Sequence, residues 1–349
     1  MSVLDIKNLN LSFRLEQGIF PALYDVSLSL KNGEIHALVG ESGCGKTMTA
    51  MSIIKLLPKN AVITSGEVMY QNKNLLDLPN KEMQKIRGSE IALIPQDPMT
   101  SLNPLYTIGN QLAEVISKDK SLTKSQIISK AADVLDMVKI PDSKEKLEVY
   151  PHELSGGMKQ RVIIAMALAT NAKIIIADEP TTALDVTIQA QILDLINDLK
   201  KKRGLSCIFI THDLGVVAHM ADRVAVMYAG KIVEYGTVDE IFFEPKHPYT
   251  WALLSSIPDI NSKEKLESIP GTPPDMLYPP VGDAFALRSK YALDIDFKYE
   301  PPFFKVSDTH YAATWLLHKD APVVAMPKIV EERIKNAKKI DEEMGYGKE

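Results

Sequence analysis

The sequence has little cysteine and no long apolar segment, and both absences narrow the class of protein. Cys44 and Cys207 are the two cysteines among 349 residues, too few for a disulfide framework, which indicates a reducing compartment. The longest clear apolar run, Val162 to Ala169, has eight residues, whereas a membrane-spanning helix needs about 18. The opening MSVLDIKNLN lacks the apolar segment of a secretory signal. We therefore expect a soluble, intracellular protein that reaches a membrane only through a partner.

An excess of basic charge is also absent. The formal net charge is −5 and the pI is about 5.9, so we expect no nucleic-acid partner bound by bulk electrostatics. The 18 glycines and 21 prolines are too few for a collagen-like or low-complexity chain. Apolar residues make up 45% and charged residues 24%, so the chain can bury a sizeable core. Its length allows two domains, or one large domain with an appendage.

Short apolar strands alternate with helical segments through the first two thirds of the chain, which predicts an α/β fold. Strands are expected at Leu4–Phe13, Leu23–Leu30, Glu34–Val39, Glu67–Tyr70, Ile91–Pro95, Ile174–Ala177 and Ser206–Thr211, helices at Gly45–Leu57 and Val186–Lys202, a helical stretch in two or three pieces at Asn103–Ile140, and a hairpin at Arg223–Tyr235. The chain becomes rich in proline near Phe243. We therefore expect a main domain over residues 1–243 and a small C-terminal extension over residues 244–349.

One glycine-rich segment predicts a phosphate site. Residues Gly40-Glu41-Ser42-Gly43-Cys44-Gly45-Lys46-Thr47 match the pattern G-x-x-x-x-G-K-[ST] between an apolar strand and a helix. Glycines let backbone N–H groups converge on phosphate oxygens, and the helix that follows points its positive end at the anion. Lys46 can reach the β- and γ-phosphates, and Thr47 can hold Mg²⁺. The expected ligands are ATP and Mg²⁺.

A second acidic segment supports this site. The strand Ile174–Ala177 is followed directly by Asp178 and Glu179, which places two carboxylates at the carboxyl end of a strand, where α/β sheets bind ligands. Asp178 would support Mg²⁺ and its water shell, and Glu179 would accept a proton from the attacking water or orient it. Alone this pattern is weak, but it gains weight beside the glycine-rich segment.

A third motif carries a family resemblance. Leu154-Ser155-Gly156-Gly157-Met158-Lys159-Gln160-Arg161 resembles the signature of the ATP-binding-cassette (ABC) ATPases. The resemblance covers about residues 1–250 and implies a P-loop fold with a RecA-like core, an antiparallel β subdomain and a helical subdomain at about 97–165. Ser155, Gly156 and Gly157 precede a helix, so they offer a hydroxyl and free N–H groups as a second anion site. In the family this corner completes the site of a partner cassette, with two ATP molecules at a head-to-tail interface.

Other residues take their expected roles from the same resemblance. Gln96 matches the Q-loop glutamine, which also approaches Mg²⁺, and Asp185 closes the D-loop segment Ala183-Leu184-Asp185. His212 matches the switch histidine that faces the γ-phosphate, and Phe13 stands where an aromatic ring stacks on adenine. The expected catalytic residues are thus Glu179, His212 and Gln96. Hydrolysis would let a nucleotide-joined pair of subunits part.

Two further segments narrow the resemblance. Residues 96–104, QDPMTSLNP, and the motifs His247-Pro248-Tyr249-Thr250 and Ile269-Pro270-Gly271-Thr272-Pro273-Pro274 resemble oligopeptide/dipeptide importer ATPases. The resemblance implies ATP-driven import of oligopeptides at the cytoplasmic face of the cell membrane. The implied partners are two membrane-spanning permease subunits, a paralogous ATPase subunit and, indirectly, an extracellular peptide-binding protein. Dipeptides, nickel or another small solute remain alternative cargoes.

The C-terminal extension departs from the family in one respect. Many relatives have four cysteines there that can hold an iron–sulfur cluster. The matching positions in this chain are Asp283, Ser289, Asp296 and Thr314. Such a cluster needs thiolate ligands, and none of these residues is a thiol. We therefore expect no iron–sulfur cluster, with the extension held by packing around Phe285, Tyr291, Trp315 and Leu316.

Two classes outside transport are weighed against this interpretation. ABC ATPases that act on ribosomes usually have two cassettes in one chain. ABC ATPases that act in DNA repair have a long coiled-coil insertion. This sequence shows neither a second cassette nor such an insertion. A regulatory subunit that does not hydrolyse ATP would be expected to lack Glu179 or His212, and both are present. An energy-coupling subunit of a peptide importer remains the leading hypothesis.

Overall fold

The computed structural model describes residues 2–182, 184–257 and 269–344. Its centre is an eight-stranded sheet with the strand order β11-β12-β10-β9-β3-β8-β7-β6. The strands are β3 (Ile35–Val39), β6 (Ile91–Ile94), β7 (Ile174–Asp178), β8 (Ser206–Ile210), β9 (Arg223–Tyr228), β10 (Lys231–Thr237), β11 (Phe303–Lys305) and β12 (Tyr311–Ala313). Strands β9, β3, β8, β7 and β6 are parallel, and the β9–β10–β12–β11 edge is antiparallel. The predicted α/β fold class is therefore confirmed.

The inner strands are apolar along their whole length because both faces of the sheet are covered. Every residue of β3, β7 and β8 is buried. Parallel strands with helices on both faces have such continuous apolar runs rather than alternating ones. The carboxyl ends of β6, β7 and β8 consequently lie side by side at one edge of the sheet. That edge brings together residues that are far apart in the sequence.

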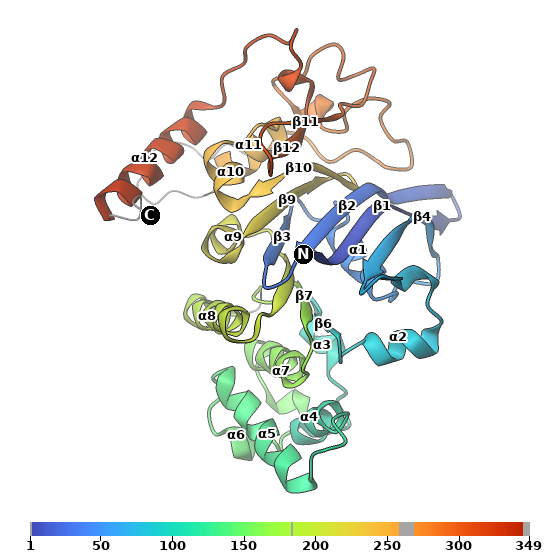
Figure 1. Ribbon diagram of the computed structural model, residues 1–349, viewed down its shortest axis with the longest axis vertical. Coiled ribbons are helices and arrows are strands. Elements are labelled where there is room, and N and C mark those ends of the chain that lie inside the picture. The colour runs from blue at the N-terminus through green and yellow to red at the C-terminus, as the bar shows by residue number, and fades with distance from the viewer. Residues whose placement is uncertain (1, 183, 258–268, 345–349) are drawn as a thin grey trace.

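A second, antiparallel sheet has the strand order β2-β1-β4-β5 and lies beside β3 and β9 in Figure 1. Its strands are β1 (Ser2–Leu15), β2 (Gly18–Lys31), β4 (Ala61–Tyr70) and β5 (Lys73–Asn74). Strands β1 and β2 are longer than predicted at both ends, and β4 begins earlier than predicted. The β1–β2 pairing contains several register shifts, and Asn8 and Asp25 have positive φ angles near them. Such bulges break strict alternation, so the sequence pattern underestimates the strand length.

The helices are α1 (Lys46–Ile53), α2 (Asn80–Ile86), α3 (Pro98–Ser101), α4 (Ile108–Ile116), α5 (Lys124–Met137), α6 (Ser143–Lys146), α7 (Gly156–Ala169), α8 (Val186–Arg203), α9 (Leu214–Met220), α10 (Val238–Phe243), α11 (Pro248–Ser255) and α12 (Lys328–Met344). Helices α4, α5, α6 and α7 gather at the opposite end of the molecule from the C-terminal extension, whereas α10, α11 and α12 lie at the same end as that extension (Figure 1). Short 3-10 helices occupy Leu75–Asp77, Pro151–Glu153, Ala286–Arg288 and Trp315–Leu317.

One predicted helix ends earlier than expected, and the helical stretch 103–140 is divided into separate helices as expected. The helix after the glycine-rich segment ends at Ile53 rather than Leu57, because Lys55 adopts a left-handed conformation and donates its ammonium group to the carbonyls of Leu76 and Leu78. The predicted helical stretch 103–140 consists of α4 and α5, each begun by a threonine whose hydroxyl caps the first turn. These helices pack against α7, and their apolar residues share one core with β6, β7 and β8.

The segment after residue 243 is joined to the main sheet. Strand β12 pairs with β10, so the C-terminal residues extend the sheet by two strands. A buried hydrogen bond fixes this junction: His310 Nε2 lies 2.8 Å from Glu234 Oε1, and both side chains are fully buried. Glu234 also accepts the backbone N–H groups of Lys246 and His247. In the part of the chain that the structure describes, no helix is both long and apolar enough to cross a membrane.

A candidate nucleotide-binding site

The glycine-rich loop lies between β3 and α1, as predicted. Gly40, Gly43 and Gly45 all have positive φ angles, which side chains with a Cβ rarely adopt. A Cβ on Gly40 would lie 2.1 Å from the carbonyl oxygen of Met227, so only glycine fits there. Ser42 and Gly43 are exposed at the tip of the loop. The loop therefore presents its backbone to solvent at the N-terminal end of α1, which suits an anion.

Lys46 and Cys44 are buried beneath this loop. The Lys46 ammonium group donates to the carbonyls of Gly40 (2.7 Å) and Glu41 (2.9 Å), so the loop closes around its own lysine. Burial raises the pKa of the Cys44 thiol, although Lys46 nearby opposes that effect. The thiol is therefore a packing group under the loop rather than a thiolate nucleophile.

Asp178 ends β7 beside Thr47, the last residue of the motif. Both carboxylate oxygens of Asp178 are buried and have no hydrogen-bond partner. Burial raises the pKa of the Asp178 carboxyl, and the nearby Thr47 and Lys46 partly oppose this rise. Neither of them forms a hydrogen bond with the carboxylate. A buried carboxylate with two unused oxygens is a donor set that fits a hard divalent cation such as Mg²⁺. The residues present thus suit the expected metal.

Gln96, Glu179 and His212 meet at the carboxyl edge of the sheet. They follow β6, β7 and β8, three neighbouring strands. Gln96 Nε2 lies 3.3 Å from Glu179 Oε2, and His212 Nδ1 lies 3.3 Å from Glu179 Oε1. Glu179 has a φ angle of 47°, a strained conformation for a residue with a side chain, and its N–H donates to the carbonyl of Ile210. The structure therefore brings together the three predicted catalytic residues.

Sequence reasoning missed one neighbour of this group. The Thr182 hydroxyl donates to Glu179 Oε2 at 3.2 Å and helps to fix the carboxylate. Its position three residues after Glu179 is the signal that could have revealed it, because threonine hydroxyls often bond to groups within the same turn.

The serine–glycine corner lies elsewhere on the chain. Ser155 caps α7, with its hydroxyl accepting the N–H of Met158, and both Ser155 and Gly156 are exposed. A Cβ on Gly156 would meet no atom within 4 Å. Helix α7 packs on α3, α4, α5 and β6, whereas α1 packs on β2, β7 and β8, so the corner and the phosphate loop lie on different parts of the chain. The corner is open to a partner.

Asp185 and Phe13 lie outside the cluster around Glu179. Asp185 caps α8, accepting the N–H of Ile188 at 3.0 Å, and it is exposed next to Val186. Ala183, the first residue of the same predicted segment, lies outside the described residues. Phe13 is half-buried opposite Phe20 in the β1–β2 hairpin, with the two ring centroids 6.4 Å apart. The adenine-stacking role of Phe13 stays a prediction.

The four positions that match cluster cysteines use their oxygen atoms within local turns. Asp283 Oδ1, Ser289 Oγ and Thr314 Oγ1 each accept the N–H two residues further along, and Asp296 Oδ2 accepts the N–H of Leu293. Each of these side chains therefore already has a hydrogen-bonding role. Among the described residues, no group of three or more His, Cys, Asp or Glu side chains is arranged to hold a metal ion.

Comparison with known proteins identifies the family. Residues 23–182 match the ABC transporter family, and residues 233–295 match the oligopeptide/dipeptide transporter C-terminal region. The chain is 56% identical to the oligopeptide transport ATP-binding protein OppD of Bacillus subtilis over 95% of this chain and 94% of that protein. The chain belongs to the ATP-binding proteins of the oligopeptide/dipeptide ABC transporter family.

Other relatives of this ABC protein agree. It is 54% identical to the dipeptide transport ATP-binding protein DppD of Lactococcus lactis, over 92% of this chain and 93% of that one. Among solved structures, the ATP-binding cassette MJ0796, a dimer in a post-hydrolysis state bound to ADP and Pi, aligns with a TM-score of 0.62 and 30% identity. That alignment covers 67% of this ABC protein and 98% of the cassette. The P-loop ABC fold predicted from the motifs is confirmed.

Proposed function

We propose that this chain hydrolyses ATP to power the import of oligopeptides across the cell membrane. The observation that carries the proposal is the meeting of Gln96, Glu179 and His212 at the sheet edge where Asp178 lies beside the phosphate loop. The printed names of its relatives, OppD and DppD among them, support peptides as the cargo.

The mechanism follows from the positions of these residues. The backbone of the loop and the N-terminus of α1 bind the phosphates, and Lys46 exchanges its two carbonyl partners for phosphate oxygens. Thr47, Gln96 and Asp178 would hold Mg²⁺, which neutralises charge on the phosphates when bound. Glu179 accepts a proton from the attacking water, and His212 on its other side faces the γ-phosphate. Gln96, His212 and Thr182 fix the carboxylate of Glu179, whose backbone has a positive φ angle.

The exposed corner of Ser155, Gly156 and Gly157 would complete the nucleotide site of a second cassette. Its free N–H groups at the start of α7 suit the γ-phosphate of a nucleotide held by that cassette's own loop. The dimeric arrangement of MJ0796 supports such a pairing. We place Asp185 at the same interface because it is exposed, and we take a paralogous ATPase subunit as the second cassette.

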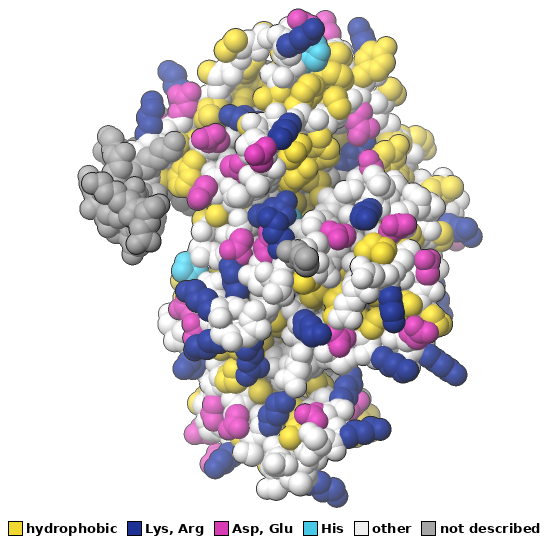
Figure 2. Space-filling view, in the orientation of Figure 1, with side chains coloured by type: hydrophobic (Ala, Val, Ile, Leu, Met, Phe, Trp, Pro, Cys, Tyr) yellow, Lys and Arg dark blue, Asp and Glu magenta, His cyan; other side chains and the backbone are white. Residues whose placement is uncertain are grey.

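The remaining partners follow from the same proposal. Two membrane-spanning permease subunits receive the energy, an extracellular peptide-binding protein delivers the cargo, and this chain lies on the cytoplasmic face of the membrane. Residues 1–243 form the ATP-binding domain, with a helical subdomain at about 97–165, and residues 244–349 form the C-terminal extension. On the face shown in Figure 2, basic and acidic side chains are interspersed, and no broad basic patch favours nucleic acid.

Dipeptides are the second candidate cargo, because the dipeptide transport protein DppD is nearly as similar as OppD. A competition assay separates the two. Vesicles holding the assembled importer would take up a labelled pentapeptide in the presence of an excess of unlabelled dipeptide or tetrapeptide. We expect ATP-dependent uptake that the tetrapeptide inhibits and the dipeptide does not. ATP-dependent uptake of a labelled dipeptide with no uptake of the pentapeptide would assign the importer to dipeptides, and uptake of the pentapeptide without ATP would contradict the proposal.

A further inference from the structure

Arg288, in the C-terminal extension, forms an ion pair with the phosphate loop. Its guanidinium group grips the carboxylate of Glu41 with both terminal nitrogens, at 2.5 and 2.9 Å. The Arg288 side chain is 5% exposed and that of Glu41 is 26% exposed. Arg288 Nε also donates to the carbonyl of Pro270 at 2.7 Å. This two-point geometry fixes the orientation of both groups, which a single lysine contact would not do.

Glu41 is the second residue of the phosphate-binding motif, and the extension holds it twice. Its backbone N–H donates to the hydroxyl of Tyr249 in α11 at 2.8 Å. Its carbonyl accepts from Lys46 at 2.9 Å. Residues beyond position 243 therefore hold Glu41 through its N–H and its carboxylate, while its carbonyl contacts the lysine that binds phosphate. A shift of Glu41 would move the carbonyl that orients Lys46.

An aromatic cluster keeps Arg288 and Tyr249 in place. The rings of Tyr228, Tyr249 and Phe285 lie 4.6 to 5.3 Å apart between centroids, and all three are buried. The Arg288 guanidinium lies 5.7 Å from the centre of the Tyr228 ring and 5.9 Å from that of Phe285. Packed aromatic rings restrict side-chain rotation, and the contact with a cation adds to this. The support for Glu41 is therefore rigid.

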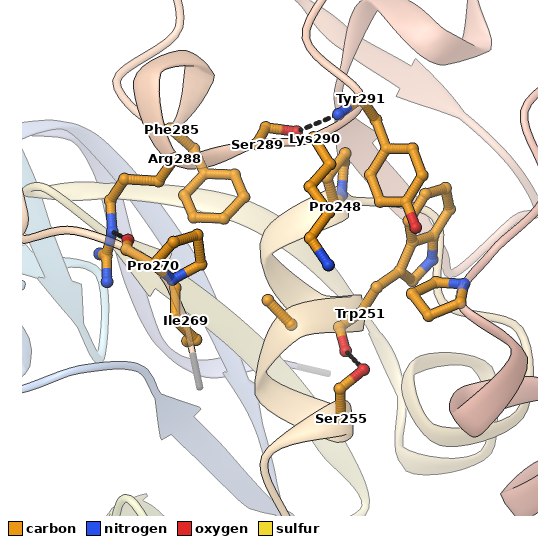
Figure 3. A pocket seen from close by; sticks show the side chains of 12 residues that line it. Pro248, Trp251, Ser255, Ile269, Pro270, Phe285, Arg288, Ser289, Lys290 and Tyr291 are labelled. Atoms are coloured by element: carbon orange, nitrogen blue, oxygen red, sulfur yellow. Dashed lines mark hydrogen bonds between the residues drawn. The ribbon is translucent and has the colours of Figure 1, made fainter. Parts of the chain in front are cut away.

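The cavity that Arg288 lines is too small for a nucleotide. Figure 3 shows Arg288 and Phe285 on one turn beside a cavity of about 50 Å³, and Arg288 bonds to Pro270. A cavity of this size has room for a few water molecules. Binding of a nucleotide at the cavity is excluded by its volume. The role of Arg288 is thus directed at Glu41.

We propose that Arg288 and Tyr249 are positioning residues for ATP binding. They hold Glu41 so that the phosphate loop is already in its binding geometry when the nucleotide arrives. The inference rests on the proposed function, since it concerns the same ATP site. Loss of either contact should weaken ATP binding, because the loop then has to be ordered by the nucleotide itself. Neither residue touches Gln96, Glu179 or His212, so the hydrolysis step should change little.

The test compares four variants of the full-length chain. Arg288→Met removes the charge but keeps the length of the side chain, and Arg288→Lys keeps the charge without the two-point grip. Tyr249→Phe removes a single oxygen atom. Leu287→Ala, at the neighbouring position where the side chain is 81% exposed, is the matched control. The dissociation constant for Mg-ATP is measured for each, and KM and kcat are measured in the assembled importer.

We expect Arg288→Met to raise the dissociation constant and KM about tenfold, Arg288→Lys to recover part of that loss, and Tyr249→Phe to raise both about threefold. The value of kcat should stay within about twofold of wild type. If Arg288 and Tyr249 had a purely structural role, the substitutions would lower the melting temperature but would not raise KM while leaving kcat unchanged. If Arg288→Met does not fold, Tyr249→Phe decides the matter. Wild-type affinity in the folded variants would overturn the inference, whereas failure of the wild type itself to bind ATP would contradict the proposed function instead.

Discussion

The imidazole Nδ1 of His212 lies 3.3 Å from Glu179 Oε1, while the other oxygen of that carboxylate lies 3.3 Å from Gln96 Nε2. One carboxylate thus has a partner on each side. The arrangement depends on the order of the strands, because β6, β7 and β8 are neighbours and each of the three residues follows one of them. Thr182 holds Glu179 from the same turn. The cluster of Gln96, Glu179 and His212 is therefore assembled by the main sheet, whereas the contacts of the C-terminal extension reach the phosphate loop.

Lys46→Ala should lose affinity for the nucleotide. In the structure the ammonium group bonds within its own loop, to the carbonyls of Gly40 and Glu41 and to Cys44 Sγ, so we expect its removal to leave the fold intact but to deprive the phosphates of a charged donor. We expect ATP binding to weaken by about 10- to 100-fold, measured by calorimetry. Lys59→Ala, which changes an exposed lysine beyond α1, is the control and should bind normally. Unchanged binding by Lys46→Ala would contradict the phosphate role.

Asp178→Asn should stabilise the nucleotide-free protein while abolishing Mg²⁺-dependent hydrolysis. Burial raises the pKa of Asp178, and a carboxyl with a raised pKa loses stability as the pH rises through that pKa. At neutral pH the buried carboxylate therefore costs stability, and an uncharged amide removes that cost. We expect a gain of about 1 kcal/mol, equivalent to a few degrees in melting temperature. A lower melting temperature would show that the carboxylate is satisfied without a metal.

His36 should make the protein less stable in mild acid. Burial, with Arg223 and Lys31 adding to it, lowers the pKa of His36 to about 3, and its Nε2 has no hydrogen-bond partner. In the unfolded chain His36 has its ordinary pKa of about 6.5 and takes up a proton below that pH. In the folded chain His36 stays neutral until the pH approaches 3. Stability should therefore fall as the pH drops from about 6.5 towards 3, by up to about 1.4 kcal/mol per pH unit.

The check on His36 is denaturant unfolding of wild type and His36→Gln at pH 7 and pH 5. The variant should lose less stability between these two pH values, because one proton no longer separates the folded and unfolded states. Other titrating groups contribute equally to both proteins and cancel in the comparison. Parallel losses in the two proteins would assign the acid sensitivity to a different residue.

Purified protein should contain no stoichiometric iron or acid-labile sulfide. Asp283, Ser289, Asp296 and Thr314 provide hard oxygen atoms, each engaged with a backbone N–H of its own turn, where a cluster needs thiolates. Elemental analysis after anaerobic purification checks this directly. Iron and sulfide in stoichiometric amounts would refute it.

The phosphate loop and the strand ends were predictable from the sequence because their signals are local. The spacing of glycines around Lys46 and the acidic pair after a buried strand are each contained within a few residues. The order of the strands in the sheet cannot be predicted from local sequence signals, so the roles of Gln96 and His212 were inferred from the family resemblance, and their contacts with Glu179 were found in the structure. The contact between Arg288 and Glu41 spans 247 positions and has no periodicity to reveal it.

The extents of several elements were also beyond sequence reasoning. Strands β12 and β11 join the extension to the main sheet, because β12 pairs with β10 and β11 pairs with β12. Each of the two strands has three residues, which is too short for a recognisable alternation of apolar and polar residues. The register shifts between β1 and β2 hid the true length of that hairpin. In both cases tertiary pairing decides where the strand ends, and local propensity does not.

The central claim is that Glu179 is the base at a site shared between this chain's loop and a partner's serine–glycine corner. The most direct test is ATP turnover and nucleotide retention in the assembled importer carrying Glu179→Gln, with the Lys46→Ala importer as the control that does not bind. We expect turnover at this site to fall at least about 100-fold while ATP stays bound and the two ATPase subunits remain associated. Turnover at the wild-type rate, or rapid release of unhydrolysed ATP, would contradict the account.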